Sequence, residues 1–392
     1  MPKADIGRRI RAIYEERPYP GPGQISIRQS GQQLPPLEWI RAICGMRDWS
    51  PSRILVAGCG TGVEALALRK RFPNAQVVGV DFTPKSIEQA KALQNGVRTG
   101  LPVRFLVGDL TDRKFMSFLG AEFDLISCHG VLSYVSKPVV ALQNLQRSLA
   151  ENGVLYLGVN GGAHFSALAR PALRALGLDL EKLPPERQLR RVLRLFDALG
   201  AEADWQRAKL PVNYLAGDLF GPLIHNLALD QWIRLSHAAG LSFTGQYYAF
   251  KKLRGAINEG LLDILRPWSR AQVYLLIDRL DPCEFHQMIL TKQPTVSPPW
   301  GKQRMLDMRP VLTRLYRIVP KEKRKLLRLE SEPINTIVEI DSARWEYQFL
   351  RSSTGERTVG EILQKLSQRI GWQPLLKRLY LFYHLAAINF EQ

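Results

Sequence analysis

The sequence predicts an α/β fold, in which a mostly parallel sheet carries helices on both faces and a small α+β module follows it. The first observation is that short apolar, β-branched runs alternate with helical segments between residues 53 and 159, which is typical of βαβ units. The second is a leucine- and arginine-rich stretch after residue 160, which predicts a helical insertion. The third is the proline-rich segment 294–301, which predicts a linker because proline continues neither a helix nor a central strand.

The expected strands are short and almost continuously apolar, as strands buried on both faces of a parallel sheet must be. They lie at residues 53–57, 76–80, 103–107, 123–127 and 154–159, with helices between them at 63–71, 84–95 and 138–149. Thr83 stands before Pro84, so we expect a helix capped by Thr83 with proline at its first position.

The later segments are expected to complete the sheet and to form the C-terminal module. A helix at 230–239, strands at 241–250 and 285–292, and a helix at 260–279 between those strands belong to the sheet domain. In the module, TIVEI and WEYQFL are interpreted as strands, and helices are expected at 358–367 and 374–387. A winged-helix-like arrangement of this module is left open. The predicted domains are an N-terminal lid or strap at 1–50, an α/β domain at 51–293 with its helical insertion at about 161–228, a linker at 294–302, and a small α+β domain at 303–392.

The chain is basic, with 54 Lys and Arg against 36 Asp and Glu in 392 residues. A formal net charge of +18 favours polyanionic or acidic partners through its long-range field. The most basic run, at 314–328, is expected to be the solvated face of a helix, and phosphate binding is the alternative. Charge therefore leaves nucleic acid open as a partner and does not establish it.

Cysteine content and hydropathy exclude several other classes of protein. The four cysteines, Cys44, Cys59, Cys128 and Cys283, form no CxxC pair, so neither a disulfide framework nor a zinc site is expected, and no metal is predicted. No apolar run approaches the roughly 18 to 20 residues that cross a bilayer, and the first twenty residues lack the apolar region of a secretion signal. We expect a soluble cytoplasmic protein without a membrane span.

Three glycines follow the first expected strand directly: Gly58, Gly60 and Gly62. Glycine allows a tight turn and a close approach to a ligand, and the helix that follows presents its N-terminal amides. The spacing is GxGxG, whereas the dinucleotide fingerprint is GxGxxG. The difference argues against a pyrophosphate ligand.

Acidic residues close the next two expected strands. Asp81 ends the second strand, where its carboxylate can accept hydrogen bonds from both hydroxyls of a ribose. Asp109 ends the third strand, where it can accept a hydrogen bond from an adenine amino group; the alternative is that it caps a helix. The sequence therefore predicts a nucleoside site at the carboxyl edge of the sheet.

In their order and spacing, these motifs and the segment FDLISCHGVLSYVSKP at 123–138 resemble the class I S-adenosylmethionine-dependent methyltransferases over roughly residues 50–160. The resemblance implies a Rossmann-like methyltransferase sheet with S-adenosyl-L-methionine as cofactor. The cofactor-binding residues that it implies are Gly58, Cys59, Gly60 and Gly62 at the methionine part, Asp81 and Phe82 at the ribose, Asp109 and Leu110 at the adenine, and Cys128 in the stretch that faces cofactor and acceptor. Val56 stands where many members carry an acid, so the methionine amino group needs another partner, such as a backbone carbonyl of the turn.

The segment YEERPYPGPG at 14–23 looks like the Tyr, Glu and Pro-Tyr-Pro segment upstream of the core in a bacterial methyltransferase group. That group includes protein-lysine methyltransferases. Proline stiffens such a segment in an extended form, so Tyr19 is either part of a lid over cofactor and acceptor or part of a packing strap.

Three residues are candidates for a catalytic role: His129, Asn160 and Tyr19. His129 could orient the acceptor or act as general base, or it could be structural; Asn160 could place its amide toward the acceptor, or it could belong to a turn. In-line displacement at a sulfonium methyl needs mainly orientation, so the acceptor proton could go to a base or to water.

The predicted function is methyl transfer to an acceptor that the sequence does not identify, with a protein side chain or a small metabolite preferred. One alternative is a nucleic-acid-binding protein or an RNA methyltransferase that uses the basic C-terminal module. Another is a nucleotide-sugar or NAD enzyme on the same architecture. A homodimer is also left open.

Overall fold

The computed structural model describes most of the chain. The described residues are 3–21, 25–31, 33–97, 100–120, 122–180, 187, 190, 191, 194, 198, 217–256, 268–295, 298–321, 326–341, 344–366 and 368–391. Much of the middle of the expected helical insertion, between residues 181 and 216, and the first part of the helix expected at 260–279 therefore lie outside them.

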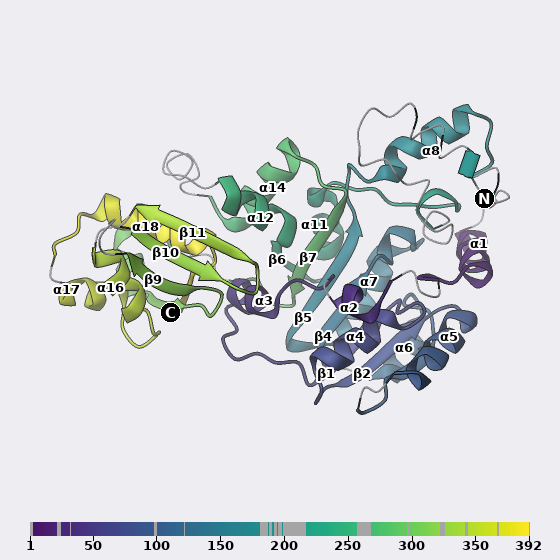
Figure 1. Ribbon diagram of the computed structural model, residues 1–392, viewed down its shortest axis with the longest axis horizontal. Coiled ribbons are helices and arrows are strands. Elements are labelled where there is room, and N and C mark those ends of the chain that lie inside the picture. The colour runs from purple at the N-terminus through teal and green to yellow at the C-terminus, as the bar shows by residue number, and fades with distance from the viewer. Residues whose placement is uncertain are drawn as a thin grey trace. The chain divides into compact units, whose positions relative to one another are not determined.

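A seven-stranded sheet forms the centre of the first compact unit (Figure 1), in the order β3-β2-β1-β4-β5-β7-β6. Its strands are β1 (Arg53–Ala57), β2 (Gln76–Asp81), β3 (Arg104–Val107), β4 (Phe123–His129), β5 (Leu149–Asn160), β6 (Ser242–Gln246) and β7 (Phe285–Thr291). The pairs among β1 to β5 are parallel, and β7 runs antiparallel to β5. The strand order reverses between β1 and β4, and open α/β sheets bind their ligands at such a switch point, beyond the carboxyl ends of the strands.

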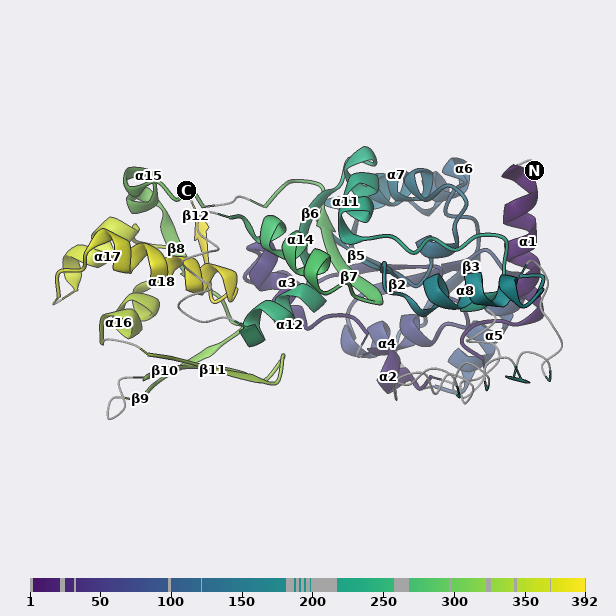
Figure 2. The same cartoon turned by 90° about the horizontal axis from the view of Figure 1, so that it is seen from above.

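Helices cover both faces of this sheet, and Figure 2 shows α4 and α5 on one side and α6, α7 and α11 on the other. The helices of this unit are α1 (Lys3–Glu16), α2 (Ile27–Gly31), α4 (Val63–Arg71), α5 (Pro84–Asn95), α6 (Arg113–Leu119), the 3₁₀ turn η1 (Leu132–Tyr134), α7 (Pro138–Ser148), α8 (Phe165–Ala175) and α11 (Leu229–Ala238). Helix α4 is buried along most of its length because α2 also packs on it. Its buried Arg69 donates hydrogen bonds to the carbonyl oxygens of Leu101, Phe72, Ala75 and Pro73, which satisfy a guanidinium that would otherwise be costly to bury.

The second compact unit consists of Pro35–Ser50, Thr244–Leu280 and Pro294–Gln392. The C-terminal module thus packs with two earlier segments of the chain. The unit contains a two-stranded sheet, β12-β8, and a three-stranded sheet, β11-β10-β9. Its elements are α3 (Leu37–Cys44), α12 (Tyr247–Ala256), α14 (Arg270–Leu280), α15 (Lys302–Asp307), β8 (Arg309–Leu312), β9 (Arg317–Lys321), β10 (Leu326–Ser331), β11 (Thr336–Asp341), α16 (Arg344–Ser352), α17 (Val359–Lys365), α18 (Trp372–His384) and β12 (Ile388–Glu391).

The fold class predicted from the sequence is confirmed, and three local predictions are wrong. The segment WEYQFL belongs to helix α16, where the buried Trp345 and Phe349 lie one turn apart on the same face. The described parts of the basic run at 314–328 contribute to strands β9 and β10 of an antiparallel sheet and form no helix face. The expected strand at 241–250 ends at Gln246, and helix α12 begins at the next residue, Tyr247.

Thr83 is the N-cap residue of α5, as predicted, but its side chain makes no capping hydrogen bond. Its hydroxyl instead donates to Asp81. Across the described ranges, no helix combines the length and the apolar character needed to span a membrane.

Candidate functional site

The turn after β1 is built from three glycines with positive φ: 76° at Gly58, 51° at Gly60 and 85° at Gly62. The amides of Gly58 and Cys59 donate to the carbonyl oxygen of Val80, at 2.7 and 2.8 Å, which ties the turn to the end of β2. A Cβ on Gly58 would lie 2.3 Å from the side chain of Val131, and one on Gly60 would lie 2.1 Å from the Tyr19 carbonyl oxygen. Only glycine therefore fits these two positions.

Asp81 ends β2 beside this turn, and its side chain is only 8% exposed. Its Oδ1 accepts from the Thr83 amide at 2.9 Å and the Thr83 hydroxyl at 2.7 Å, and its Oδ2 accepts from the Gly60 amide at 2.9 Å. Because a carboxylate oxygen has two lone pairs, both lone pairs of Oδ1 are engaged, whereas Oδ2 has one lone pair free for a further hydrogen bond.

Burial raises the pKa of Asp81, and the carboxylate of Glu15 adds to this, against the lowering effect of the hydrogen bonds from Thr83 and Gly60. Within the part of the chain that the structure describes, no cation pairs with this carboxylate. Asp81 is thus a buried acceptor that is open to one more donor.

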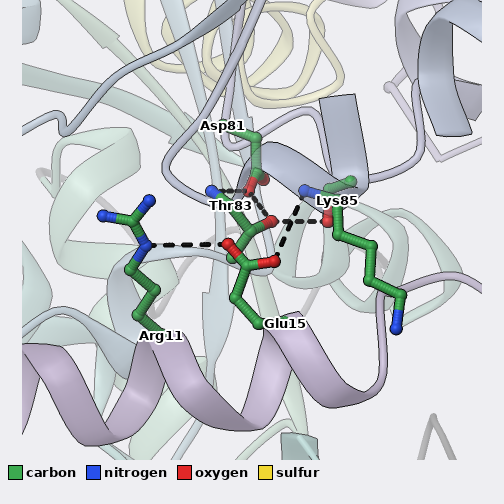
Figure 3. Close-up of polar contacts among 6 residues, drawn as sticks. Arg11, Glu15, Asp81, Thr83 and Lys85 are labelled. Carbon is green, nitrogen blue, oxygen red and sulfur yellow. Dashed lines mark hydrogen bonds and ion pairs between the residues drawn. The ribbon is translucent and has the colours of Figure 1, made fainter. Parts of the chain in front are cut away.

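Helix α1 reaches this edge of the sheet and meets the start of α5 (Figure 3). The Glu15 carboxylate accepts a hydrogen bond of 3.4 Å from the amide of Lys85, in the first turn of α5, and lies 3.7 Å from Arg11. Lys85 Nζ in turn donates to the Glu16 carbonyl oxygen at 3.5 Å. Tyr14, on the same helix, packs edge-on against Phe82, with ring centres 6.2 Å apart. Helix α1 therefore lies against the residues that follow β2.

The segment after α1 lies directly on the glycine turn. The Thr61 amide donates to the Tyr19 carbonyl oxygen at 3.2 Å, and the Thr61 hydroxyl donates to the Pro20 carbonyl oxygen at 2.8 Å. Tyr19 thus meets the predicted site through its backbone. The segment at residues 19–20 therefore packs on the glycine turn as a strap, held by these two hydrogen bonds.

Asp109 and Leu110 follow β3 and differ in exposure. Asp109 is exposed, and its Oδ1 accepts from the Thr111 amide at 2.7 Å and the Thr111 hydroxyl at 2.8 Å. The helix cap that the sequence left as the alternative is made by Asp112, which accepts from two amides at the start of α6. Leu110 is 6% exposed, and its carbonyl oxygen accepts from Asn144.

His129 ends β4 and is held by Tyr156. Its Nδ1 lies 2.7 Å from the Tyr156 hydroxyl, which donates its proton to the Gln33 carbonyl oxygen. When the Tyr156 hydroxyl donates to Gln33, His129 Nδ1 is the donor of this pair and the lone pair of the neutral ring lies on Nε2. Burial lowers the pKa of His129 to about 4, so the ring is neutral at neutral pH.

Asn160 ends β5 within a buried polar cluster of side chains. Its amide nitrogen Nδ2 donates to Asn226 at 3.1 Å and to the Tyr134 hydroxyl at 3.4 Å. The Tyr134 hydroxyl donates to Asp218 at 2.7 Å. Burial raises the pKa of Tyr134, and the Asp218 carboxylate adds to the rise. The Tyr14 ring lies 6.4 Å from that of Tyr134, so helix α1 also borders this cluster.

Several of these residues carry no signal in the sequence. Asp218 lies near the end of the expected insertion at 161–228, and no motif marks Tyr134 as its partner. Glu15 belongs to the YEERPYPGPG segment, whose acid could have been assigned to the site. Two predicted residues, Cys59 and Cys128, are buried, and burial raises the pKa of both thiols.

Comparison with known proteins finds similarity in the segment that carries these motifs. Residues 55–155 match the family described as a methyltransferase domain. An uncharacterized protein of Synechococcus is 27% identical over 287 residues, covering 66% of this chain and 65% of that protein. The malonyl-[acyl-carrier protein] O-methyltransferase of Dechloromonas aromatica is 29% identical over 157 residues, covering 38% of this chain and 55% of the enzyme. This chain thus spans less than two thirds of the length of these relatives.

Among solved structures, PKMT2 from Rickettsia typhi in complex with AdoHcy superposes with a TM-score of 0.54 at 17% identity. The match covers 91% of this chain and 75% of that one. This likeness shows a shared fold. Together with the matched domain, it confirms the class I methyltransferase fold that the sequence predicted.

Proposed function

We propose that this protein transfers a methyl group from S-adenosylmethionine to an acceptor bound at the carboxyl edge of the seven-stranded sheet. The observation that carries the proposal is the combination of Asp81, a buried carboxylate with one open acceptor position, and the glycine turn next to it. The methyltransferase-domain match over residues 55–155 supports it, as does the structure of PKMT2 with AdoHcy.

The residues present fit a nucleoside with a ribose hydroxyl near Asp81. Oδ2 of Asp81 has room for one such donor, while Oδ1 is taken by Thr83. The second oxygen of Asp109 and the backbone around Leu110 would contact the adenine. Phe82 and Tyr14 supply aromatic surface beside the ribose. When bound, S-adenosylmethionine supplies a methyl group made electrophilic by the sulfonium.

The chain's own residues would exclude water, position the acceptor and take up its proton. Helix α1 and the Tyr19 segment cover the turn and the end of β2, and Tyr14 and Tyr134 border the polar cluster around Asn160. In the tautomer in which Nδ1 donates to Tyr156, His129 Nε2 would carry the lone pair of the neutral ring. Because the pKa of His129 is about 4, it would act as a weak base suited to an acceptor that loses its proton readily.

For the acceptor, we propose a protein side chain or a small metabolite. The matched relatives include an enzyme named for methylation of malonyl-[acyl-carrier protein] and a demethylmenaquinone methyltransferase of Thermus thermophilus. None of these names favours the nucleic-acid alternative. A cytoplasmic location and a homodimer belong to the same proposal, and cell fractionation and light scattering test them.

The test is to incubate the protein with methyl-labelled S-adenosylmethionine and a fractionated lysate. We expect label in protein or in small molecules, and less label with the Asp81→Asn variant. Label that appears only in nucleic acid would reverse the acceptor assignment. Absence of transfer together with absence of cofactor binding would remove the proposal.

A further inference from the structure

The second compact unit contains a cavity of about 420 Å³ that takes no part in the proposed methyl transfer. Its walls come from α3 and the loop after it, the start of α14, residue 295, strand β8 and the two residues after it, the end of α18, and strand β12. All three chain segments of the unit thus contribute to it. The volume lies in the range of roughly 300 to 1,000 Å³ that small-molecule sites occupy.

Four arginines line this cavity: Arg41, Arg47, Arg270 and Arg314. Arg270 is the most buried of them, with 5% exposure. Its guanidinium stacks 3.9 Å from the centre of the Tyr383 ring, and Nε and Nη2 donate to the Tyr383 carbonyl oxygen. No carboxylate pairs with Arg270 anywhere in the described ranges. A buried cation without a counter-charge is costly, so an anion in the cavity would stabilise it.

The other three arginines add positive charge at the same place. Arg41 Nε donates to the Trp49 carbonyl oxygen at 2.7 Å, and this neutral partner leaves the Arg41 charge unbalanced. Arg47 is exposed and contacts no acid in the parts of the chain that the structure covers. Arg314 pairs with Asp48 at 2.9 Å.

One acid, Glu391, also lines the cavity. Four arginines thus face two carboxylates, those of Glu391 and Asp48. The surroundings of the cavity therefore keep an excess of positive charge.

The remaining lining is partly polar, with Thr295, Thr313 and Asn389, and partly apolar or aromatic, with Ile43, Val311, Tyr383 and Phe390 among its members. Guanidinium groups bind phosphate oxygens through paired N–H donors, and an aromatic wall favours a flat organic body. We propose that this cavity binds a small phosphate-bearing molecule of about mononucleotide size, with the phosphate at Arg270 and Arg47.

The test is calorimetric titration of the full-length protein with uridine 5′-monophosphate. A uridine probe avoids the adenine that the proposed cofactor site would recognise. We expect one mole of nucleotide bound per chain and no binding of uridine. Absence of heat with the nucleotide, or equal binding of uridine, would overturn the proposal.

Variants locate the site. Arg270→Gln should weaken binding by about tenfold or more, because it removes a charged donor from a buried position, and Arg47→Gln should weaken it severalfold. Arg369→Gln changes an exposed arginine of the same unit outside the cavity and should leave the affinity unchanged. If Arg270→Gln does not fold, the exposed Arg47→Gln still decides, because unchanged affinity in that variant refutes the assignment. Retention of nucleotide binding by Asp81→Asn separates this site from the proposed methyltransferase site.

Discussion

Asp81→Asn is the sharpest perturbation of the proposed cofactor site, because it keeps the size of the side chain and removes its charge. In the wild type, Oδ1 accepts two hydrogen bonds from Thr83, and Oδ2 accepts one from the Gly60 amide. An asparagine oxygen can retain both Thr83 bonds. The amide nitrogen that then replaces Oδ2 cannot accept from Gly60 or from a ribose hydroxyl.

The magnitude follows from the single acceptor position that Oδ2 leaves open. One hydrogen bond to a charged group contributes about 1.5 to 3 kcal/mol, so the dissociation constant of S-adenosylhomocysteine should rise roughly ten- to hundredfold. Two effects on stability oppose each other: a bond to Gly60 is lost, and the cost of ionising a carboxylate whose pKa is raised by burial is removed. We therefore expect the free energy of unfolding to change by about 1 kcal/mol or less.

Asp124 provides a matched control at the opposite edge of the sheet. Its Oδ2 accepts from the Ser52 amide, the Ser52 hydroxyl and the Arg53 amide, at 2.8, 2.7 and 2.9 Å. Partial burial raises the pKa of Asp124, but these hydrogen bonds outweigh it and hold the pKa below its usual value. Asp124→Asn should lower stability at neutral pH, an effect that fades as the pH falls through the pKa of the folded state, and should leave cofactor affinity unchanged. Calorimetric titration of both folded variants with S-adenosylhomocysteine measures these affinities. Equal affinities of wild type and Asp81→Asn would refute the ribose assignment.

Three further predictions concern the strap, a buried acid and the second unit. Gly60→Ala places a Cβ 2.1 Å from the Tyr19 carbonyl oxygen, so hydrogen exchange in residues 14–21 should accelerate; unchanged exchange would contradict the strap. Burial raises the pKa of Glu64 from 4.5 to about 7, so wild-type stability should fall as the pH rises through that window, and Glu64→Gln should be more stable above pH 7 by up to about 3 kcal/mol. Parallel pH profiles for the two proteins would rule this out. Glu346→Ala removes the carboxylate that lies 3.1 Å from the largely buried Arg378 and should lower the free energy of unfolding by about 3 kcal/mol in urea titrations, whereas the exposed Glu361→Ala should cost less.

The sheet domain is predictable from sequence because its elements carry strong local signals. Each central strand is a continuous apolar run, and the helices Val63–Arg71 and Pro84–Asn95 begin and end at the residues expected. The glycine turn is predictable too, since its positive φ values suit glycine.

The second unit is less predictable, because tertiary packing decides its local structure. The alternation in WEYQFL suits a strand, yet as a helix it buries Trp345 and Phe349 together and brings Glu346 to Arg378. Most described residues of the basic run at 314–328 belong to strands β9 and β10, which pair with each other, and β10 also pairs with β11, later in the chain. The periodicity of a short sequence window shows neither which side chains pack together in the fold nor which strands pair.

Only those parts of the candidate site that lie within one short sequence motif were predictable from the sequence. Asp81 and the three glycines stand at fixed positions after strands. Glu15 reaches the start of α5 from a helix about seventy residues earlier, and Asp218 meets Tyr134 across 84 residues. No local sequence pattern predicts such contacts between distant segments, so only the structure reveals them.

A crystal structure of the protein with S-adenosylhomocysteine is the most direct test of the central claim. We predict a nucleoside lying beyond the carboxyl ends of β1, β2 and β3, with a ribose hydroxyl bonded to Oδ2 of Asp81 and the amino acid part against the glycine turn. A product bound elsewhere on the chain, or crystals that stay free of it at saturating concentration, would contradict the claim.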